Sequence, residues 1–275
     1  MAGNVRNKVG ALLIHGLGGT QFDLGALHKV LQGCGVDTHS VTLPGHGTEP
    51  TDLLKVTAED WLNTVRQAYR SLLLQYETVH ILGMCMGALL AIETAKRENH
   101  TRGRLVALAP PVFFDGWSTP WYRWARHVVY RLGSLATRMR VEEECPFGVK
   151  NELVRRIVKG KFARGDAFHY KWVPLQCIRQ VDRLRTWVKQ GLDQIACPTM
   201  VLHAREDELT SLRSAYFLQA EMSAAQPELV VLENSYHMIC VDNDRDLVAA
   251  NVARHLNLDT TPIQKVRRDG SIRLM

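Results

Sequence analysis

The sequence has no apolar run of about 18 residues, the length that an α-helix needs to cross a bilayer. We therefore expect no stable insertion into a membrane. The start, MAGNVRNKVGALLIHG, lacks the longer apolar stretch and the small-residue cleavage site of a secretory signal, which favours a cytoplasmic protein. Internal repeats and low-complexity tracts are also missing, and this argues against a solenoid or a disordered linker protein.

The six cysteines lack the spacing of a metal or disulfide framework. No CxxC pair and no Cys/His ligand pattern occurs, so we expect neither a zinc site nor a disulfide network, and no metal or organic cofactor. Free cysteine behaves as a small hydrophobic residue. We therefore expect buried free thiols at five positions: Cys34, Cys145, Cys177, Cys197 and Cys240.

The remaining pattern alternates between short apolar runs and helix-like segments. With 275 residues, 46% of them hydrophobic, the chain is long enough for one large core with an insertion. Strands are predicted at 10–14, from 36, at VHIL, at RLVAL, at CPTMVLHA and at PELVVLE, with helices at 22–33, 58–76, 88–97, LRSAYFLQAEM and DLVAANVARHL. This alternation predicts an α/β fold with a mostly parallel sheet and helices on both faces.

The segment 111–195 interrupts that alternation. It carries 16 Lys and Arg against 8 Asp and Glu, a net of +8 in a chain of net +6, and it gathers Trp117, Trp121, Trp124, Trp172 and Trp187. We interpret it as an inserted helical segment between two halves of one core, 1–110 and 196–258, with a loosely held basic tail at 259–275. Its charge suits either an anionic partner or a solvated arginine-rich surface. The tryptophans favour packing or a pocket wall over stacking on nucleic acid.

The stretch GMCMG, residues 83–87, joins the predicted strand VHIL to the next helix. A nucleophile on a sharp strand-to-helix turn needs glycine two residues before and two after it, because the backbone there is crowded and strained. Gly83 and Gly87 meet this demand, and Cys85 would be the exposed group. The helix N-terminus also directs partial positive charge at the sulfur, which favours a thiolate.

Three further stretches complete the pattern of an acyl-transfer site. HGLGG follows the first strand, and its Leu17 amide, with the Met86 amide, is placed to stabilise an oxyanion. Asp207 follows a later strand and His237 follows the last one, giving the chain order nucleophile, acid, histidine as Cys85, Asp207, His237.

Over residues 10–256 the chain resembles the α/β-hydrolase superfamily. HGLGGT, LPGHGTEP, GMCMG, HAREDE and SYHMI stand in the expected order, and the HGxxG and GHG signatures are most similar to bacterial carboxylesterases and monoacylglycerol lipases. The resemblance implies a helical cap at 111–195 lining the pocket, the triad named above and an acyl ester as substrate. One position departs from the family, which usually has serine where this chain has Cys85. Cysteine occurs there in remoter relatives, the dienelactone hydrolases and polyester synthases.

Other residues compete for these roles. Glu206 and Glu208 flank Asp207, which we prefer as the acid because it matches the family aspartate. His15 and His46 lie in glycine-rich turns, where histidine mostly bonds nearby backbone. His203 lies within a predicted strand and is expected to be a core histidine with its hydrogen bonds satisfied.

A thiolate leaves a tetrahedral intermediate more readily than an alkoxide, so thioesters and activated esters suit Cys85 better than ordinary esters do. Three hypotheses remain open. The first is an ester or thioester hydrolase with an acyl-cysteine intermediate. The second is an acyltransferase that takes the acyl group from coenzyme A or an acidic acyl carrier protein at the basic cap and passes it to an amine or alcohol. The third is a non-catalytic binding module or a serine enzyme with its nucleophile replaced. No nucleic-acid partner is expected.

Overall fold

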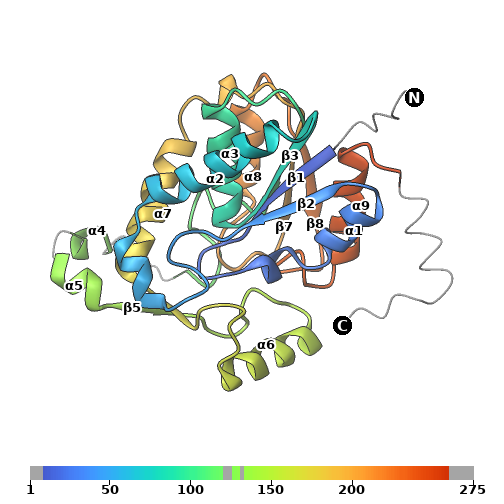
Figure 1. Cartoon of the computed structure of the whole chain (residues 1–275). Coiled ribbons are helices and arrows are strands. Elements are labelled where there is room, and N and C mark those ends of the chain that lie inside the picture. Colours follow the sequence, from blue (N-terminus) through green and yellow to red (C-terminus); the bar gives the residue numbers. More distant parts are fainter. Residues whose placement is uncertain (1–8, 120–125, 131–132, 260–275) are drawn as a thin grey trace, which may run out of the picture.

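The computed structural model describes residues 9–119, 126–130 and 133–259. At its centre lies a six-stranded sheet in which every pair of neighbouring strands is parallel (Figure 1). In sheet order the strands are β2 (Asp37–Val41), β1 (Val9–Ile14), β3 (Thr78–Met84), β4 (Leu105–Leu108), β7 (Thr199–Ala204) and β8 (Glu228–Leu232). The predicted parallel α/β architecture is confirmed. All six carboxyl ends therefore lie at one edge of the sheet.

Helices cover both faces of the sheet because apolar side chains alternate along its strands. In β1, Leu12 and Ile14 enter one apolar cluster while Ala11 and Leu13 enter the other. On the first face lie α2 (Ala58–Leu73), α3 (Met86–Arg97), α7 (Leu175–Val188) and α8 (Arg213–Glu221); on the second lie α1 (Leu27–Gly33) and α9 (Arg245–His255). Helix α3 lies between the sheet and the pair α2 and α7, so almost all of its residues are buried.

The predicted helix over 22–33 is two elements. A 3-10 helix covers Gln21–Leu24, and α1 begins only at Leu27. Gly25 separates them with φ +52°, and a Cβ at this position would lie 2.1 Å from the carbonyl oxygen of Cys240. Further 3-10 helices of the described chain lie at Pro50–Lys55 and Leu192–Gln194.

The inserted segment is less uniform than the sequence indicated. It contains α4 (Arg126–Val129), α5 (Gly133–Arg138) and α6 (Glu152–Arg164), but also an antiparallel pair, β5 (Arg140–Glu142) with β6 (Trp172–Pro174). Valine and tryptophan, which favour strands, supply part of this pairing. Helix α7 also lies within the range 111–195 yet packs on α2 and α3 through Cys177, Val181 and Leu184. The part that projects from the sheet edge in Figure 1 is that of α4, α5, β5 and α6.

The expectation of buried thiols is wrong at two of the five positions. Cys177, Cys197 and Cys240 are buried, whereas Cys34 is half-buried and Cys145 is exposed. Cys145 lies in a loop between β5 and α6, where no apolar layer of the described chain covers it. Most of the predicted tail at 259–275 lies outside the described residues. Across the described ranges, no helix combines the length and apolar character needed to cross a membrane.

Candidate active site

Cys85 occupies the turn between β3 and α3. Its φ is +54° and its ψ is −123°, a conformation that non-glycine residues rarely adopt and that needs support from the surrounding structure. Two backbone hydrogen bonds give that support: the Cys85 N–H donates to the Leu108 carbonyl at 2.9 Å, and the Cys85 carbonyl accepts from Ala88 at 2.9 Å. The side chain is half-buried, so the sulfur is held at the carboxyl edge of the sheet without being sealed in the core.

Close backbone contacts explain the two glycines of this turn. A Cβ on Gly83 would lie 2.1 Å from the Gly87 carbonyl oxygen, and a Cβ on Gly87 would lie 2.2 Å from the Ile14 carbonyl oxygen. Both distances are far inside van der Waals contact, and the obstructing atoms are backbone. The crowding that the sequence predicted at these two positions is therefore present.

His237 and Asp207 are in direct contact. They follow β8 and β7, and the His237 Nδ1 atom lies 2.7 Å from Asp207 Oδ2, with both side chains almost completely buried. Burial disfavours a charged imidazole, but the Asp207 carboxylate and the Cys85 sulfur offset it, and the pKa of His237 lies well above 6.5. Burial likewise opposes ionisation of Asp207, yet the His237 charge and hydrogen bond bring the pKa of that carboxyl below 3.8.

Cys85 also lies near the His237 ring. The Nε2 atom of this ring is buried and has no hydrogen-bond partner of normal geometry in the described chain, while the neighbouring sulfur contributes to the raised pKa of the ring. The structure thus brings His237 into contact with Asp207 and close to Cys85.

The two glutamates beside Asp207 have other contacts. Glu208 Oε2 accepts a hydrogen bond from the backbone N–H of His237 at 3.0 Å, and burial raises the pKa of the Glu208 carboxyl. Glu206 is exposed and pairs with Lys150 at 2.8 Å. Neither carboxylate is hydrogen-bonded to the His237 ring within the described residues, so the geometry favours Asp207 as its partner.

His203 differs from its expected description. It is completely buried in β7, but neither ring nitrogen has a hydrogen bond of normal geometry within the described residues. Its Nδ1 atom lies 3.6 Å from Asp207 Oδ2. The histidine is therefore in the core, as expected, but its ring nitrogens are not hydrogen-bonded as expected.

The HGLGG loop lies directly against the turn that carries Cys85. A Cβ on Gly16 would lie 3.1 Å from the Cys85 Cβ, a tight approach that favours glycine, and Leu17 is the next residue. In the turns, loops and caps of the described chain, the amides of Leu17 and Met86 donate to no backbone carbonyl. Both amides therefore remain candidates for the predicted oxyanion role.

The buried carboxylate of Asp23 holds the HGLGG loop in place. Asp23 Oδ2 accepts a hydrogen bond from the Gly16 N–H at 2.9 Å, and a Cβ on Gly19 would lie 1.9 Å from that oxygen. Asp23 falls inside a predicted helix, and no local pattern in the sequence points to this contact.

His15 and His46 bind backbone atoms, as the sequence predicted. His15 Nδ1 donates to the Gly16 carbonyl at 2.8 Å, and its Nε2 accepts from Leu43 at 3.3 Å. His46 Nε2 accepts from the Gly18 N–H at 2.9 Å, which requires a neutral ring. Burial and the nearby His15 lower the pKa of His46 to about 3, so the ring stays neutral over the physiological range.

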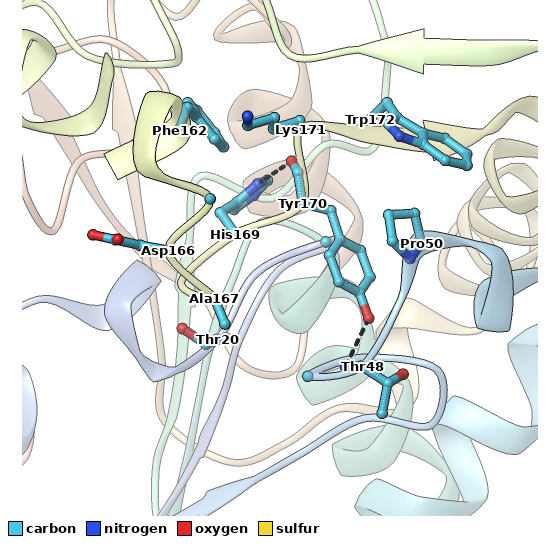
Figure 2. A pocket seen from close by; sticks show the side chains of 13 residues that line it. Thr20, Thr48, Pro50, Phe162, Asp166, Ala167, His169, Tyr170, Lys171 and Trp172 are labelled. Atoms are coloured by element: carbon cyan, nitrogen blue, oxygen red, sulfur yellow. Dashed lines mark hydrogen bonds between the residues drawn. The ribbon is translucent and has the colours of Figure 1, made fainter. Parts of the chain in front are cut away.

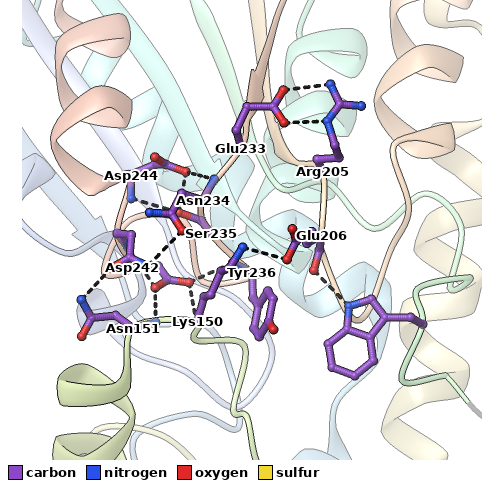
Figure 3. A network of polar contacts seen from close by, with 12 residues as sticks. Lys150, Asn151, Arg205, Glu206, Glu233, Asn234, Ser235, Tyr236, Asp242 and Asp244 are labelled. Carbon is purple, nitrogen blue, oxygen red and sulfur yellow. Dashed lines mark hydrogen bonds and ion pairs between the residues drawn. The ribbon is translucent and has the colours of Figure 1, made fainter.

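Asp242 is a second site residue that was not identified from the sequence. It organises the loop that contains His237, and its contacts are drawn in Figure 3. This carboxylate is fully buried and accepts four backbone N–H groups at 2.7 to 2.9 Å, those of Lys150, Asn151, Tyr236 and Asn243. Since Met238 N–H also donates to Gly148 at 2.8 Å, the histidine loop is fastened to the segment that precedes α6.

Residues 168–170 of the inserted segment are hydrogen-bonded to the HGLGG loop and the residue after it. The Tyr170 N–H donates to the Gly18 carbonyl at 2.8 Å, and Thr20 Oγ1 donates to the Phe168 carbonyl at 2.9 Å. Tyr170 also stacks on His46 and donates its hydroxyl proton to Gly45. A pocket of about 240 Å³ lies beside this junction, with walls that include Thr20, Thr48, His169 and Trp172 (Figure 2).

Two of the described tryptophans of the inserted segment stack with arginines. Arg140 lies over the Trp172 ring at 4.1 Å, and Arg183 lies over the Trp187 ring at 5.1 Å, so part of the positive charge is used in cation–π contacts. Trp117 is 60% exposed and donates its indole proton to the Glu206 carbonyl. Trp121 and Trp124 lie outside the described residues. Searching the described chain for three or more His, Cys, Asp or Glu side chains arranged around one metal ion finds no such group.

Comparison with known proteins gives a consistent result. The profile of the Alpha/beta hydrolase family matches residues 11–251. The thermostable monoacylglycerol lipase of Bacillus sp. (strain H-257) is 26% identical over 243 residues, 87% of each protein. The carboxylesterase of Bacillus subtilis (strain 168) is 24% identical over 248 residues, 89% of this chain and 91% of the esterase.

A solved structure shares the fold. The monoacylglycerol lipase of Paleococcus ferrophilus superimposes with a TM-score of 0.75 at 17% identity, over 90% of this chain and 93% of that one. The family profile spans most of the sequence, and the sheet order, the strand-to-helix turn and the histidine loop all lie within it. The chain is therefore an enzyme that belongs to the alpha/beta hydrolase family.

Proposed function

We propose that this enzyme hydrolyses carboxylic esters or thioesters through a covalent acyl-cysteine intermediate on Cys85. The observation that carries the proposal is the grouping of Cys85, His237 and Asp207: a half-buried thiol on a strained turn, an imidazole close to it, and a carboxylate 2.7 Å from the Nδ1 atom of that imidazole. A nucleophile, a base and a group that orients the base are what acyl transfer requires.

The proposed reaction has two stages, acylation of Cys85 and hydrolysis of the acyl-cysteine. His237 Nε2 takes the proton of the Cys85 thiol, and the sulfur forms a bond to the acyl carbon while the carbonyl electron pair moves to oxygen. The Leu17 and Met86 amides hydrogen-bond this oxyanion. As the carbonyl re-forms, the bond to the leaving group breaks, and His237 gives its proton to the departing alcohol or thiol. Water, deprotonated by His237, attacks the acyl-cysteine in the same way and releases the acid and the free thiol.

The relatives support an ester as substrate, since the two Bacillus proteins are named as a monoacylglycerol lipase and a carboxylesterase. The sulfur favours acyl groups with good leaving groups, because a thiolate is expelled from the tetrahedral intermediate more readily than an alkoxide. We therefore expect thioesters and activated esters to react faster than simple alkyl esters.

Acyl transfer is the second candidate function, and the thiol is the observation that favours it. An acyl-cysteine is itself a thioester, and an amine or alcohol bound near His237 attacks it by the same route as water. Coenzyme A or an acidic acyl carrier protein would then be donors, drawn to the basic segment 111–195. Product analysis of butyryl-coenzyme A turnover with and without glycerol separates the candidates: transfer gives a glycerol ester, and hydrolysis gives butyrate alone.

The deciding experiment combines two variants with mass spectrometry. The intact protein is exposed to p-nitrophenyl butyrate and to butyryl-coenzyme A, and its mass is recorded. We expect a butyryl adduct on the unchanged enzyme and none on Cys85→Ala, which should lose all turnover. Alkylation with iodoacetamide should inactivate the enzyme in step with modification of Cys85.

The matched variant Cys85→Ser tests the alternative in which serine is the working nucleophile. We expect it to retain less thioesterase activity than the cysteine enzyme. Wild-type turnover by Cys85→Ala, or harmless alkylation together with a gain of activity in Cys85→Ser, overturns the mechanism.

A further inference from the structure

His203 is a buried histidine next to the triad that the mechanism above does not use. It lies in β7 with no exposed surface, and both ring nitrogens lack a hydrogen bond of normal geometry in the described chain. An unsatisfied buried polar group is costly and needs an explanation. Its Nδ1 atom lies 3.6 Å from Asp207 Oδ2.

The hydrogen bonds of Asp207 leave one position open on that side. Oδ1 accepts the N–H groups of Leu209 and Thr210 at 2.9 and 3.0 Å. Oδ2 accepts the Nδ1 proton of His237 at 2.7 Å. Since each carboxylate oxygen has two lone pairs, Oδ2 retains one, and His203 is the neighbouring side chain with a proton to offer.

We propose that His203 is a positioning residue for the triad: in its neutral form it carries its proton on Nδ1 and directs this N–H at Asp207 Oδ2 across 3.6 Å, an electrostatic contact longer than a hydrogen bond that holds the carboxylate against His237. The contact does not depend on the proposed function, but its effect on the reaction rate rests on that function. In this proposal His203 acts through Asp207 and not on the substrate.

The groups around His203 select this protonation state. Burial lowers the pKa of the ring, with the His237 charge acting in the same sense, while Asp207, the Ser211 carbonyl and Asp115 act in the opposite sense. The net pKa is lowered, so the ring is neutral and has one proton for two acceptors. The Asp207 carboxylate is charged and the Ser211 carbonyl is not, so the stronger electrostatic attraction places the proton on Nδ1, which lies 3.6 Å from the carboxylate.

Loss of this donor should change the chemistry rather than binding. Without the His203 N–H, the negative charge of Asp207 acts more strongly on His237, and this raises the pKa of the imidazole. The carboxylate is also freer to rotate. The acid limb of the kcat/KM profile should therefore move to higher pH. We expect kcat to fall and KM to stay the same, because no substrate contact is lost.

The test compares two substitutions at this position in the full chain. His203→Leu removes both ring nitrogens, whereas His203→Asn keeps an N–H donor close to the Nδ1 position. With p-nitrophenyl butyrate, we expect His203→Leu to lower kcat roughly three- to tenfold and to shift the acid limb upward by about half a pH unit, and His203→Asn to restore most of both. Equal behaviour of the two variants indicates a packing role only and overturns the proposal.

A measurement without turnover keeps the proposal testable if His203→Leu fails to fold. In protein labelled with ¹⁵N-histidine, the His203 signals are those that vanish in His203→Asn, and their shifts report which nitrogen carries the proton. A proton on Nδ1 supports the proposal, and a proton on Nε2 contradicts it. If Cys85→Ala remains active while the Nδ1 proton is found, the proposed function fails and this contact stands.

Discussion

The carboxyl group of Asp207 has an unusually complete set of donors for a residue whose task is to hold another side chain. Two backbone amides fix one oxygen, and the His237 ring is bound to the other. In the proposed mechanism, a carboxylate held in this way would keep the imidazole in the tautomer that accepts the Cys85 proton and would stabilise the imidazolium that then forms.

Replacing Asp207 with asparagine should leave weak residual turnover. The amide has nearly the same shape but cannot stabilise the imidazolium, and it favours the wrong tautomer of His237, so kcat should fall by roughly a thousandfold with little change in folding. Steady-state kinetics with p-nitrophenyl butyrate provide the measurement. The control is Glu206→Gln, which removes an exposed ion pair with Lys150 and should change kcat less than about twofold. A larger loss of kcat in Glu208→Gln than in Asp207→Asn would show that Glu208, and not Asp207, is the acid.

At this scale some contacts could be predicted from the sequence and others could not. The grouping of Cys85, Asp207 and His237, the two glycines of the turn and the backbone contacts of the two turn histidines were accessible because each lies within a short local pattern. Asp23 and Asp242 were not, since a carboxylate that binds backbone amides of distant segments leaves no spacing to recognise. The unsatisfied state of His203 depends on Asp207 lying beside it, which only the fold determines.

Among the elements, the turn from β3 into α3 tolerates the least change. A methyl group on Gly83 meets the Gly87 carbonyl oxygen at 2.1 Å, and neither segment can move away because both belong to elements that are almost fully buried. The strain at Cys85 is thus maintained by contacts on both sides of it.

Gly83→Ala should lower the free energy of unfolding by about 3 kcal/mol or more, because relief of this contact requires displacement of α3. Gly160→Ala is the matched control. Gly160 lies inside α6, the nearest obstacle to an added Cβ is the Arg164 side chain at 3.4 Å, and alanine is the better helix former there by about 0.5–1 kcal/mol. Urea unfolding of the two variants gives the measurement, and equal stability would contradict the crowded turn.

The loop that carries His237 depends on Asp242 in a different way. Four backbone amides from two segments converge on one buried carboxylate, so its removal leaves several donors unsatisfied at once.

We expect Asp242→Asn to lower stability by about 2–4 kcal/mol and to raise amide hydrogen exchange both at 234–243 and at 148–151, because the amide cannot accept four N–H groups with full charge. Hydrogen exchange measured by mass spectrometry tests this. Asp244→Asn is the comparison, since the Asp244 carboxylate bonds within its own loop, to Asn234 and Ser235, and should leave 148–151 unchanged. Faster amide exchange at 234–243 alone in Asp242→Asn would show that the order of 148–151 does not depend on this carboxylate.

Taken as a whole, the molecule buries several histidines in their neutral form. Burial lowers the pKa of His46 to about 3 and the pKa of His80 and His100 to about 4. Between pH 6.5 and 4 the unfolded chain takes up these protons while the folded chain does not, so stability falls as the pH is lowered through this window. The raised pKa of His237 acts in the opposite sense only above pH 6.5, so it does not offset the loss of stability within this window.

Urea unfolding should therefore give a smaller free energy at about pH 5 than at about pH 7, with each of the three histidines contributing at most about 1.4 kcal/mol per pH unit. Replacing His80 with glutamine should reduce the slope, because one of the rings with a lowered pKa is removed. A stability that is constant or rises toward pH 5 would show that these rings accept protons in the folded state.

The overall architecture was predictable because period-two and helical apolar patterns specify the sheet and its layers directly. The inserted segment was not. Its arginines and tryptophans pack on one another, as Arg183 does on Trp187, and composition does not indicate such pairs. Helix α7 buries apolar residues at helical spacing, among them Val181 and Leu184, and packs on α3, but its basic composition led to its being grouped with the inserted segment.

The hydrogen bond from Tyr170 to Gly18 limits where segments can be exchanged in chimaeras of this enzyme. A graft that exchanges residues 111–174 for the equivalent part of another hydrolase would also exchange the hydrogen bonds that hold the loop of Leu17 in place. Transplants intended to alter only the choice of acyl group should therefore keep 168–174 from the recipient and place the splice points before Phe168.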